Sequence, residues 1–341
     1  MLTESFDYDL PSELIAQEPV EPRDSSRLFV LHREEERFEH RHFYDLPDYL
    51  RPDDVLVVNK TRVIPARFYG HKVPTGGKVE LLLLGKRGPR RWESLVRGRK
   101  VDVGQRLEIG EEDDTLRGTV EAITEAGGRL IHFDEPVEPY MERLGIIPLP
   151  PYIHKTPPDL ERYQTVYSEA EGSVAAPTAG LHFTPQLIEE IREMGVEWLS
   201  VTLHIGLDTF QPVRSERVEN HQIHTEYCRL DGETARCINR AKAEGRRVIA
   251  VGTTTVRVLE SAAQDRDIGV ATWDGPTDLY IYPGYRFRVV DALITNFHLP
   301  RSSLLMLVAA FANLELIKEA YEEAVERRYR FYSFGDSMLM L

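Results

Sequence analysis

The sequence of 341 residues contains only two cysteines, Cys228 and Cys237. Two cysteines do not make the disulfide framework of a small secreted domain, so the composition fits a reducing compartment. Long apolar runs are also missing, because the longest, residues 304–312, is far shorter than the roughly 20 residues that a membrane-spanning helix needs. Residues 1–7 have neither the basic region nor the apolar core of a secretory signal. We therefore expect a cytoplasmic protein without a membrane partner.

The chain has no overall excess of positive charge, since its formal net charge is −14. This argues against a protein that coats nucleic acid indiscriminately, because such binding depends on neutralising phosphates. One segment is an exception: residues 86–100 carry seven basic side chains and one acid, Glu93, a local charge of +6. A second basic cluster consists of Arg327, Arg328 and Arg330. A solvated strand or helix face explains such runs equally well.

A metal-ligand pattern is absent as well. His221, His224, Cys228 and Cys237 invite a zinc hypothesis, but their spacing matches no structural zinc motif. We therefore expect no metal. Glu226, which lies within the same segment, is a better candidate for acid–base chemistry or ligand contact.

The length predicts about two domains, at the usual 100 to 200 residues for each. Between residues 69 and 149 the sequence consists of short strand-like runs separated by turn residues, a pattern typical of an all-β module. The runs are residues 79–84, 92–97, 106–109, 116–123 and 129–133. We predict that this module is inserted into a catalytic domain made of residues 1–68 and 150–341.

The flanking parts alternate between helix and strand. Thr184 and Pro185 are a helix start, and the apolar stripe that follows ends at Gly195. Residues 196–203 predict a strand, Asp231 caps a helix that ends at Gly245, and residues 248–251 predict a buried strand. The large domain is therefore expected to be α/β, with the β module inserted into it.

Polar and aromatic side chains concentrate in residues 275–284 and 293–303, where no packing requirement explains them. We predict that these segments form an active-site wall. Tyr280 and Tyr282 alternate on a predicted strand, so they should share one face, and aromatic faces attract cations. A plain aromatic core is the alternative. The other candidates in this wall are Asp278, Asn296, Phe297 and His298.

Two further segments could bind a ligand. Residues 252–255, Gly-Thr-Thr-Thr, follow a strand and open a helix, which suits a carboxylate or phosphate, although the hydroxyls could simply cap the helix. They lack the Walker lysine and the dinucleotide glycine pattern. Residues 175–184 combine small residues with His182, which could act as a general acid or base or equally as a structural hydrogen bonder. Thr178 belongs to this segment.

Arginines group near the N-terminus at Arg23, Arg27, Arg62 and Arg67. Guanidinium groups bind phosphate or carboxylate in a bidentate manner. Ion pairing between elements of the fold explains them equally well.

Together these segments closely resemble the S-adenosylmethionine:tRNA ribosyltransferase-isomerases of queuosine biosynthesis. The matching blocks run in order along the whole chain and include PRDSSRL (22–28), VNKTRVIPAR (58–67), GSVAAPTAGLHFT (172–184), residues 204–210, GTTTVR (252–257), residues 275–284 and 293–303, and YSFGDSML (332–339). The resemblance implies a large α/β domain around a barrel-like sheet with a small β-barrel inserted in it.

The resemblance also implies an activity. The family transfers and isomerises the ribosyl part of S-adenosylmethionine onto 7-aminomethyl-7-deazaguanine (preQ1) in the anticodon loop of tRNA, at the wobble position. Epoxyqueuosine forms, and adenine and methionine are released. S-adenosylmethionine is then a co-substrate, and neither a prosthetic group nor a metal is implied. We expect the chain to act as a monomer.

Residue roles follow as hypotheses from this chemistry. Proton transfer is assigned to His182, Glu226 and His298. Contacts with S-adenosylmethionine are assigned to Thr178, Gly252, Thr253, Thr254, Thr255, Asp278, Tyr280, Tyr282, Asn296 and Phe297. Contacts with tRNA are assigned to Arg23, Arg27, Arg62, Arg67, Arg90, Arg91 and Arg97.

Two other functions fit parts of the sequence. A conventional S-adenosylmethionine-dependent methyltransferase would bind the same co-substrate, but no glycine-rich loop with a following acidic residue is found. A non-enzymatic RNA-binding adaptor would explain residues 86–100 but not the His, Asp and Tyr side chains at the predicted turns.

Overall fold

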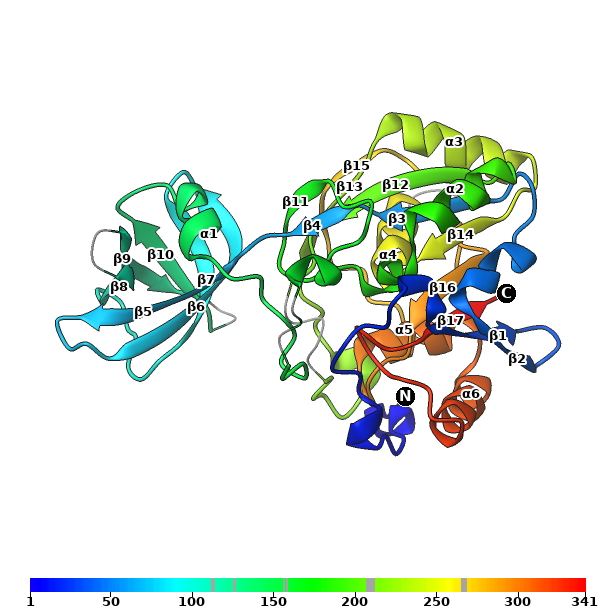
Figure 1. Cartoon of the computed structure of the whole chain (residues 1–341), viewed down its shortest axis with the longest axis horizontal. Helices are drawn as coiled ribbons and strands as arrows, with labels where there is room; N and C mark the ends of the chain where they lie inside the picture. The colour runs from blue at the N-terminus through cyan, green and yellow to red at the C-terminus, as the bar shows by residue number, and fades with distance from the viewer. Residues whose placement is uncertain (112–113, 125–126, 156, 158, 207–211, 265–268) are drawn as a thin grey trace. The chain divides into compact units, whose positions relative to one another are not determined.

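The computed structural model describes the chain except for residues 112–113, 125–126, 156, 158, 207–211 and 265–268. The described chain forms two compact units, each with its own sheet (Figure 1). Unit 1 consists of Met1–Arg62, Pro150–Ala170 and Ala176–Leu341, and unit 2 of Val63–Leu149 and Glu171–Ala175. The predicted α/β class with an inserted small β-barrel is confirmed. The boundaries of independently folding domains at residues 69 and 149 stay a prediction.

Unit 1 is built on a nine-stranded mixed sheet in the order β15-β13-β12-β3-β14-β16-β17-β1-β2. The strands are β1 (Arg27–His32), β2 (Arg37–His42), β3 (Val55–Asn59), β12 (Glu197–Leu203), β13 (Glu226–Leu230), β14 (Val248–Val251), β15 (Trp273–Thr277), β16 (Ala292–Asn296) and β17 (Ser337–Met340). β12, β3, β14 and β16 run parallel to one another, and β17 is antiparallel to β16. The parallel block therefore forms the middle of the sheet.

Both faces of the sheet are covered, so its central strands are apolar throughout. Every residue of β3, β14 and β16 is buried, as expected for parallel strands between two layers. One face packs on the helix α2 (Pro185–Glu193) and the 3-10 helix η4 (Phe43–Tyr49). On β1, Phe29 packs in a cluster of rings with Phe297 and Tyr329.

The helices begin where the sequence places hydrogen-bonding caps. The Thr184 hydroxyl accepts from the backbone N–H of Leu187 at the start of α2, and Asp231 caps α3 (Gly232–Ala243). The other long helices are α4 (Thr253–Ala262), α5 (Ser303–Phe311) and α6 (Leu314–Glu326). Among the described residues, no helix combines the length and apolar character that crossing a bilayer would require.

Unit 2 contains a closed antiparallel barrel in the order β10-β7-β6-β5-β8-β9. Its strands are β5 (Arg67–Val73), β6 (Lys78–Gly88), β7 (Arg91–Arg97), β8 (Arg106–Glu111), β9 (Asp114–Ile123) and β10 (Arg129–Phe133), and a short helix α1 (Glu138–Leu144) follows. All five strand runs predicted for this module are confirmed. The short strands β4 (Thr61–Val63) and β11 (Ala170–Ser173) form a separate two-stranded sheet.

The predicted aromatic strand through Tyr280 and Tyr282 is wrong. β15 ends at Thr277, which pairs with the first residue of β13. Beyond Thr277 the chain is no longer a strand. There the Leu279 carbonyl accepts a hydrogen bond at 3.0 Å from Nε of Arg257, a side chain of α4. The predicted turn after Tyr282 does form, since the N–H of Tyr285 donates to the Tyr282 carbonyl at 3.1 Å.

Candidate active site

The candidate site lies at the carboxyl edge of the parallel block in unit 1. Because β12, β3, β14 and β16 are parallel, the loops that follow all four strands emerge at one edge of the sheet. This edge is where open α/β sheets bind ligands. β17 runs the other way, so the loop that precedes it also reaches this edge. Residues far apart in sequence therefore meet there.

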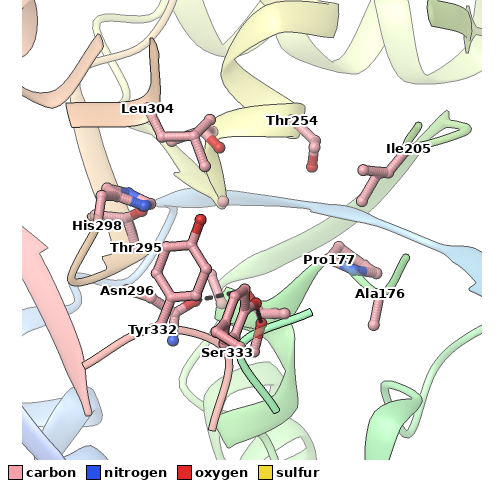
Figure 2. A pocket seen from close by; sticks show the side chains of 15 residues that line it. Ala176, Pro177, Ile205, Thr254, Thr295, Asn296, His298, Leu304, Tyr332 and Ser333 are labelled. Atoms are coloured by element: carbon pink, nitrogen blue, oxygen red, sulfur yellow. Dashed lines mark hydrogen bonds between the residues drawn. The ribbon is translucent and has the colours of Figure 1, made fainter. Parts of the chain in front are cut away.

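A cavity opens at this edge (Figure 2). Its volume is about 40 Å³, which is room for roughly three water molecules. Its lining residues are Tyr152, Ala176, Pro177, Thr178, Ala179, Ile205, Gly252, Thr253, Thr254, Thr295, Asn296, His298, Leu304, Tyr332 and Ser333. None of these residues is an aspartate, glutamate, lysine or arginine. The cavity thus offers hydroxyls, an amide, an imidazole and aromatic rings to a ligand.

A hydrogen-bonded chain connects the cavity to the protein interior. The Thr178 hydroxyl donates to Asn296 Oδ1 at 2.8 Å, and Asn296 Nδ2 lies 3.2 Å from His182 Nε2. His182 Nδ1 lies 2.7 Å from the Ser26 hydroxyl. Since the amide nitrogen of Asn296 can only donate, Nε2 accepts and Nδ1 carries the proton. The chain fixes which way the Asn296 amide faces the cavity.

His182 is deeply placed behind the cavity rather than in its wall. Its ring is buried and stacks on Phe43 with the centroids 5.1 Å apart. Burial, and then the nearby charges of Arg330, Arg23 and Arg162, lower the pKa of His182 to about 3. A neutral imidazole with both nitrogens engaged is suited to position Asn296.

His298 is the histidine that lines the cavity (Figure 2). Its Nε2 lies 2.9 Å from the Thr295 hydroxyl, and its backbone N–H donates to the Tyr321 hydroxyl at 3.1 Å. Burial lowers the pKa of His298 to about 3. The imidazole is therefore neutral at physiological pH and meets a ligand as a hydrogen-bonding group.

These buried histidines predict a loss of stability in mild acid. Unfolding returns each imidazole to a pKa of about 6.5, so below that pH the unfolded chain binds more protons than the folded chain, and stability falls as pH falls. We expect His182 and His298 each to contribute a loss of about 1.4 kcal/mol per pH unit below pH 6. Denaturant unfolding between pH 7 and 5 measures this slope. His298→Gln should lower this slope by the contribution of one histidine. A slope equal to that of the wild-type protein would contradict a neutral His298.

The start of α4 forms another side of the cavity. Gly252 has φ +87° and donates its N–H to the Ile294 carbonyl at 2.7 Å, so it reverses the chain between β14 and α4 in a conformation that glycine tolerates. Thr253 and Thr254 line the cavity, and buried Asn59 at the end of β3 donates to the Thr254 hydroxyl at 3.3 Å. Thr255 faces away, because its hydroxyl donates to the Val251 carbonyl at 2.7 Å. The helix N-terminus is suited to an anion.

Glu226 does not line the cavity. One carboxylate oxygen accepts from the Gly206 N–H at 2.9 Å, and the other is ion-paired with the buried Arg257 guanidinium. Only 7% of the Glu226 side chain and 6% of the Arg257 side chain are exposed. This buried pair joins β13 to α4, which gives Glu226 a structural role.

Four other predicted contacts also lie outside the cavity lining. Asp278 is exposed. Tyr280 and Tyr282 lie with ring centroids 5.1 Å apart, and the Tyr280 hydroxyl donates to Met306 Sδ at 2.8 Å. Phe297 is fully buried in the aromatic cluster.

Comparison with known proteins shows where the chain belongs. The sequence pattern of the family described as "Queuosine biosynthesis protein" matches residues 3–340. The chain belongs to this queuosine family. The predicted resemblance is confirmed.

Relatives cover the whole chain. An S-adenosylmethionine:tRNA ribosyltransferase-isomerase of Moorella thermoacetica is 56% identical over all of both chains, and that of Thermotoga petrophila is 52% identical over the same extent. A crystal structure of an S-adenosylmethionine tRNA ribosyltransferase from Thermotoga maritima is 42% identical, covers 99% of this chain and 100% of that one, and superposes with a TM-score of 0.58. The fold is therefore shared as well.

In this member of the queuosine family the predicted tRNA-binding arginines of unit 1 hold loops together. Arg23 donates to the carbonyls of Gln164 and Leu181 at 2.9 and 3.2 Å. Arg27 pairs with Asp336, and Arg62 pairs with Glu161 at 2.6 Å. About a third of the Arg27 and Arg62 side chains is exposed, 33% and 32%. Ion pairing explains these arginines, and a contact with tRNA stays a prediction.

Most of the basic side chains in residues 86–100 of unit 2 form ion pairs with glutamates of the same unit. Arg91 makes a bidentate pair with Glu121 at 2.8 and 3.1 Å, and Arg67 lies 3.3 Å from Glu80. Arg90 donates to the Asp134 carbonyl at 2.8 Å. Arg97 is different, because it reaches Glu80 only at 3.4 Å and is 86% exposed. Arg97 is the best placed of these side chains to meet an outside anion.

Metal-binding groups do not assemble in the described part of the chain, where no cluster of three or more His, Cys, Asp or Glu side chains is found. Cys228 is buried on β13, and Cys237 lies on α3. Residues 207–210 of the matching block 204–210 lie outside the described residues.

Several residues of the site were not predicted from the sequence. Tyr152, Tyr332 and Ser333 form one wall of the cavity, and Ser26 is the partner of His182. Ser26, Tyr332 and Ser333 lie inside blocks that resemble the queuosine family, so the blocks were a signal for them. Tyr152 lies outside those blocks, and only the folded chain brings it to the site.

Proposed function

We propose that the chain is an S-adenosylmethionine:tRNA ribosyltransferase-isomerase. The observation that carries this proposal is the relation to proteins of that name, one of which is 56% identical over all of this chain and all of its own. The cavity at the carboxyl edge of the sheet supports it, because its lining includes residues of five blocks that match the family. The substrate is preQ1 at the wobble position of tRNA, and the products are epoxyqueuosine, adenine and methionine.

The site residues fit S-adenosylmethionine in a specific orientation. The N-terminus of α4, with Gly252, Thr253 and Thr254, binds the methionine carboxylate through backbone N–H groups and hydroxyls. Asn296, oriented by Thr178, donates or accepts a hydrogen bond at the ribose. Neither a metal nor a prosthetic group is needed for this binding. Contacts from Thr255, Asp278, Tyr280, Tyr282 and Phe297 draw no support from the cavity lining.

The acid–base roles differ among the three candidates. The reaction needs a base for the acidic proton beside the sulfonium and an acid for the leaving adenine. His298 is the candidate with access to a ligand, since it lines the cavity, whereas His182 acts through Asn296. Proton transfer is therefore assigned first to His298.

A product assay tests the proposal. Purified protein is mixed with S-adenosylmethionine and tRNA carrying preQ1, and free adenine and methionine are separated by chromatography. Release of both in equal amounts, dependent on the tRNA, is expected. S-adenosylhomocysteine in place of adenine would identify a methyltransferase, and an intact co-substrate would identify an RNA-binding adaptor. Light scattering of the same sample tests the proposed monomer.

We propose that the barrel of unit 2 binds tRNA phosphates through exposed basic side chains, above all Arg97. Arg97→Ala should weaken tRNA binding and lower the slope of log affinity against log salt by about 0.9, the share of one phosphate contact. Fluorescence anisotropy with labelled tRNA from 50 to 200 mM salt measures this.

The matched control is Arg143→Ala, because Arg143 already forms a bidentate pair with Asp114 at 2.9 Å through both nitrogens. Its salt slope should equal that of the wild-type protein. An unchanged slope in Arg97→Ala would remove Arg97 from the tRNA-binding surface.

A further inference from the structure

Tyr332 stands out because it is a non-glycine residue in the left-handed region, with φ 73°. Side chains rarely adopt this conformation, and such strained residues cluster at ligand sites. Tyr332 also lines the cavity.

The loop around Tyr332 is held at several points. The Tyr332 N–H donates to the Phe297 carbonyl at 3.1 Å, and its carbonyl accepts from the Gly335 N–H at 2.9 Å. The Asp336 carboxylate accepts from the Arg330 N–H at 2.8 Å, and the Asp336 N–H donates back to the Arg330 carbonyl at 2.7 Å. At Gly335 a Cβ would lie 2.4 Å from the Arg330 carbonyl oxygen, so only glycine fits. These hydrogen bonds and the lack of space at Gly335 together hold residues 332–337 in one conformation.

The result of this conformation is the placement of an aromatic ring. Figure 2 shows the Tyr332 ring standing within the cavity, with its hydroxyl directed toward the side where Thr295, His298 and Leu304 lie. The Tyr152 ring meets it edge to face, with centroids 4.0 Å apart and planes at 76°. The Tyr152 hydroxyl is in turn hydrogen-bonded to Ser333. Burial raises the pKa of Tyr332 and of Tyr152, so both remain neutral phenols.

The charge of the lining indicates what the ring contacts. Among the described residues that line the cavity there is no carboxylate, and aromatic faces together with hydroxyl and carbonyl dipoles attract a cation there. The sulfonium of S-adenosylmethionine is a cation of this kind.

We propose that Tyr332 is a ligand-contact residue whose ring, supported by Tyr152, holds the sulfonium cation of S-adenosylmethionine. The proposal rests on the proposed function and deepens it. The sequence had suggested Tyr280 and Tyr282 for this contact, but neither residue lines the cavity.

The test compares a cationic with a neutral ligand. Dissociation constants of S-adenosylmethionine and S-adenosylhomocysteine, which lacks the methyl group and the charge, are measured by equilibrium dialysis on protein saturated with tRNA that carries guanine instead of preQ1. That tRNA has no aminomethyl nucleophile. Tyr332→Leu should weaken S-adenosylmethionine binding about tenfold more than S-adenosylhomocysteine binding. Tyr332→Phe, which keeps the ring, should retain the wild-type ratio of the two constants.

Other variants keep the result interpretable. Tyr332→Gly also removes the ring and relieves the positive φ, so it serves if the leucine variant does not fold. Tyr44→Leu, at an exposed tyrosine outside the cavity, should leave both constants unchanged. Equal weakening for both ligands, or no weakening in the leucine and glycine variants, would overturn the sulfonium contact.

Failure of the proposed function would look different. Wild-type protein would then release no adenine from S-adenosylmethionine with preQ1-containing tRNA, whatever the behaviour of the Tyr332 variants. Adenine release by the wild type together with an unchanged ligand ratio in Tyr332→Leu would refute only the role of Tyr332.

Discussion

Replacing Arg257 by leucine is expected to lower the free energy of unfolding by about 3–5 kcal/mol, since it leaves a buried carboxylate without its counter-charge. The Arg257 guanidinium pairs with Glu226 and also donates to the Leu279 carbonyl at 3.0 Å. Its loss removes these bonds and also the one that its Nη2 donates to the Thr277 carbonyl at 3.5 Å. Urea unfolding followed by circular dichroism measures the effect.

The partner variants separate stability from catalysis. Glu226→Leu alone should be similarly destabilised, and the double variant Glu226→Leu/Arg257→Leu should recover much of the loss, because no unpaired charge remains buried. Adenine release by the double variant then decides the role of Glu226. Activity within a few fold of wild type would refute Glu226 as a proton-transfer group, and a folded but inactive double variant would refute a purely structural role.

Replacing Asn296 by alanine is expected to lower kcat/KM about 100-fold, the scale of a loss of positioning at a reacting centre. Asn296 is 3% exposed, lines the cavity, and is the only described link between the Thr178 hydroxyl and the His182 imidazole. Without it the His182 ring loses the bond that fixes its tautomer. Steady-state adenine release at saturating tRNA measures the change.

The control for Asn296 is another amide that bridges two elements. Asn239 on α3 donates to the Val270 carbonyl at 2.9 Å and accepts from the Val270 N–H at 2.7 Å, away from the cavity lining. Asn239→Ala should lower thermal stability and leave kcat/KM near wild type. If Asn296→Ala behaved in the same way, Asn296 would be structural only.

Local patterns predicted the elements of the fold well. The caps and the turn depend on hydrogen bonds between residues only two or three positions apart, so a few consecutive residues are enough to predict them. This holds for Thr184, Asp231 and the turn at residues 283–284. The same holds for the five strand runs of the barrel. The aromatic strand at residues 278–282 failed because a side chain from α4, Arg257, took the place of a strand partner.

Hydrophobic periodicity, caps and long matching blocks are properties of the linear chain, so they were enough to predict the α/β class, the inserted barrel and membership in the queuosine family. Which candidates share a cavity became clear only from the folded chain. Asn296, Thr178 and His298 line the cavity together with Tyr152 and Tyr332. Glu226 lies outside the lining, in a buried ion pair with Arg257. The physical reason is that parallel strands bring distant loops to one edge of the sheet, and which side chains turn inward there depends on contacts between residues more than a hundred positions apart.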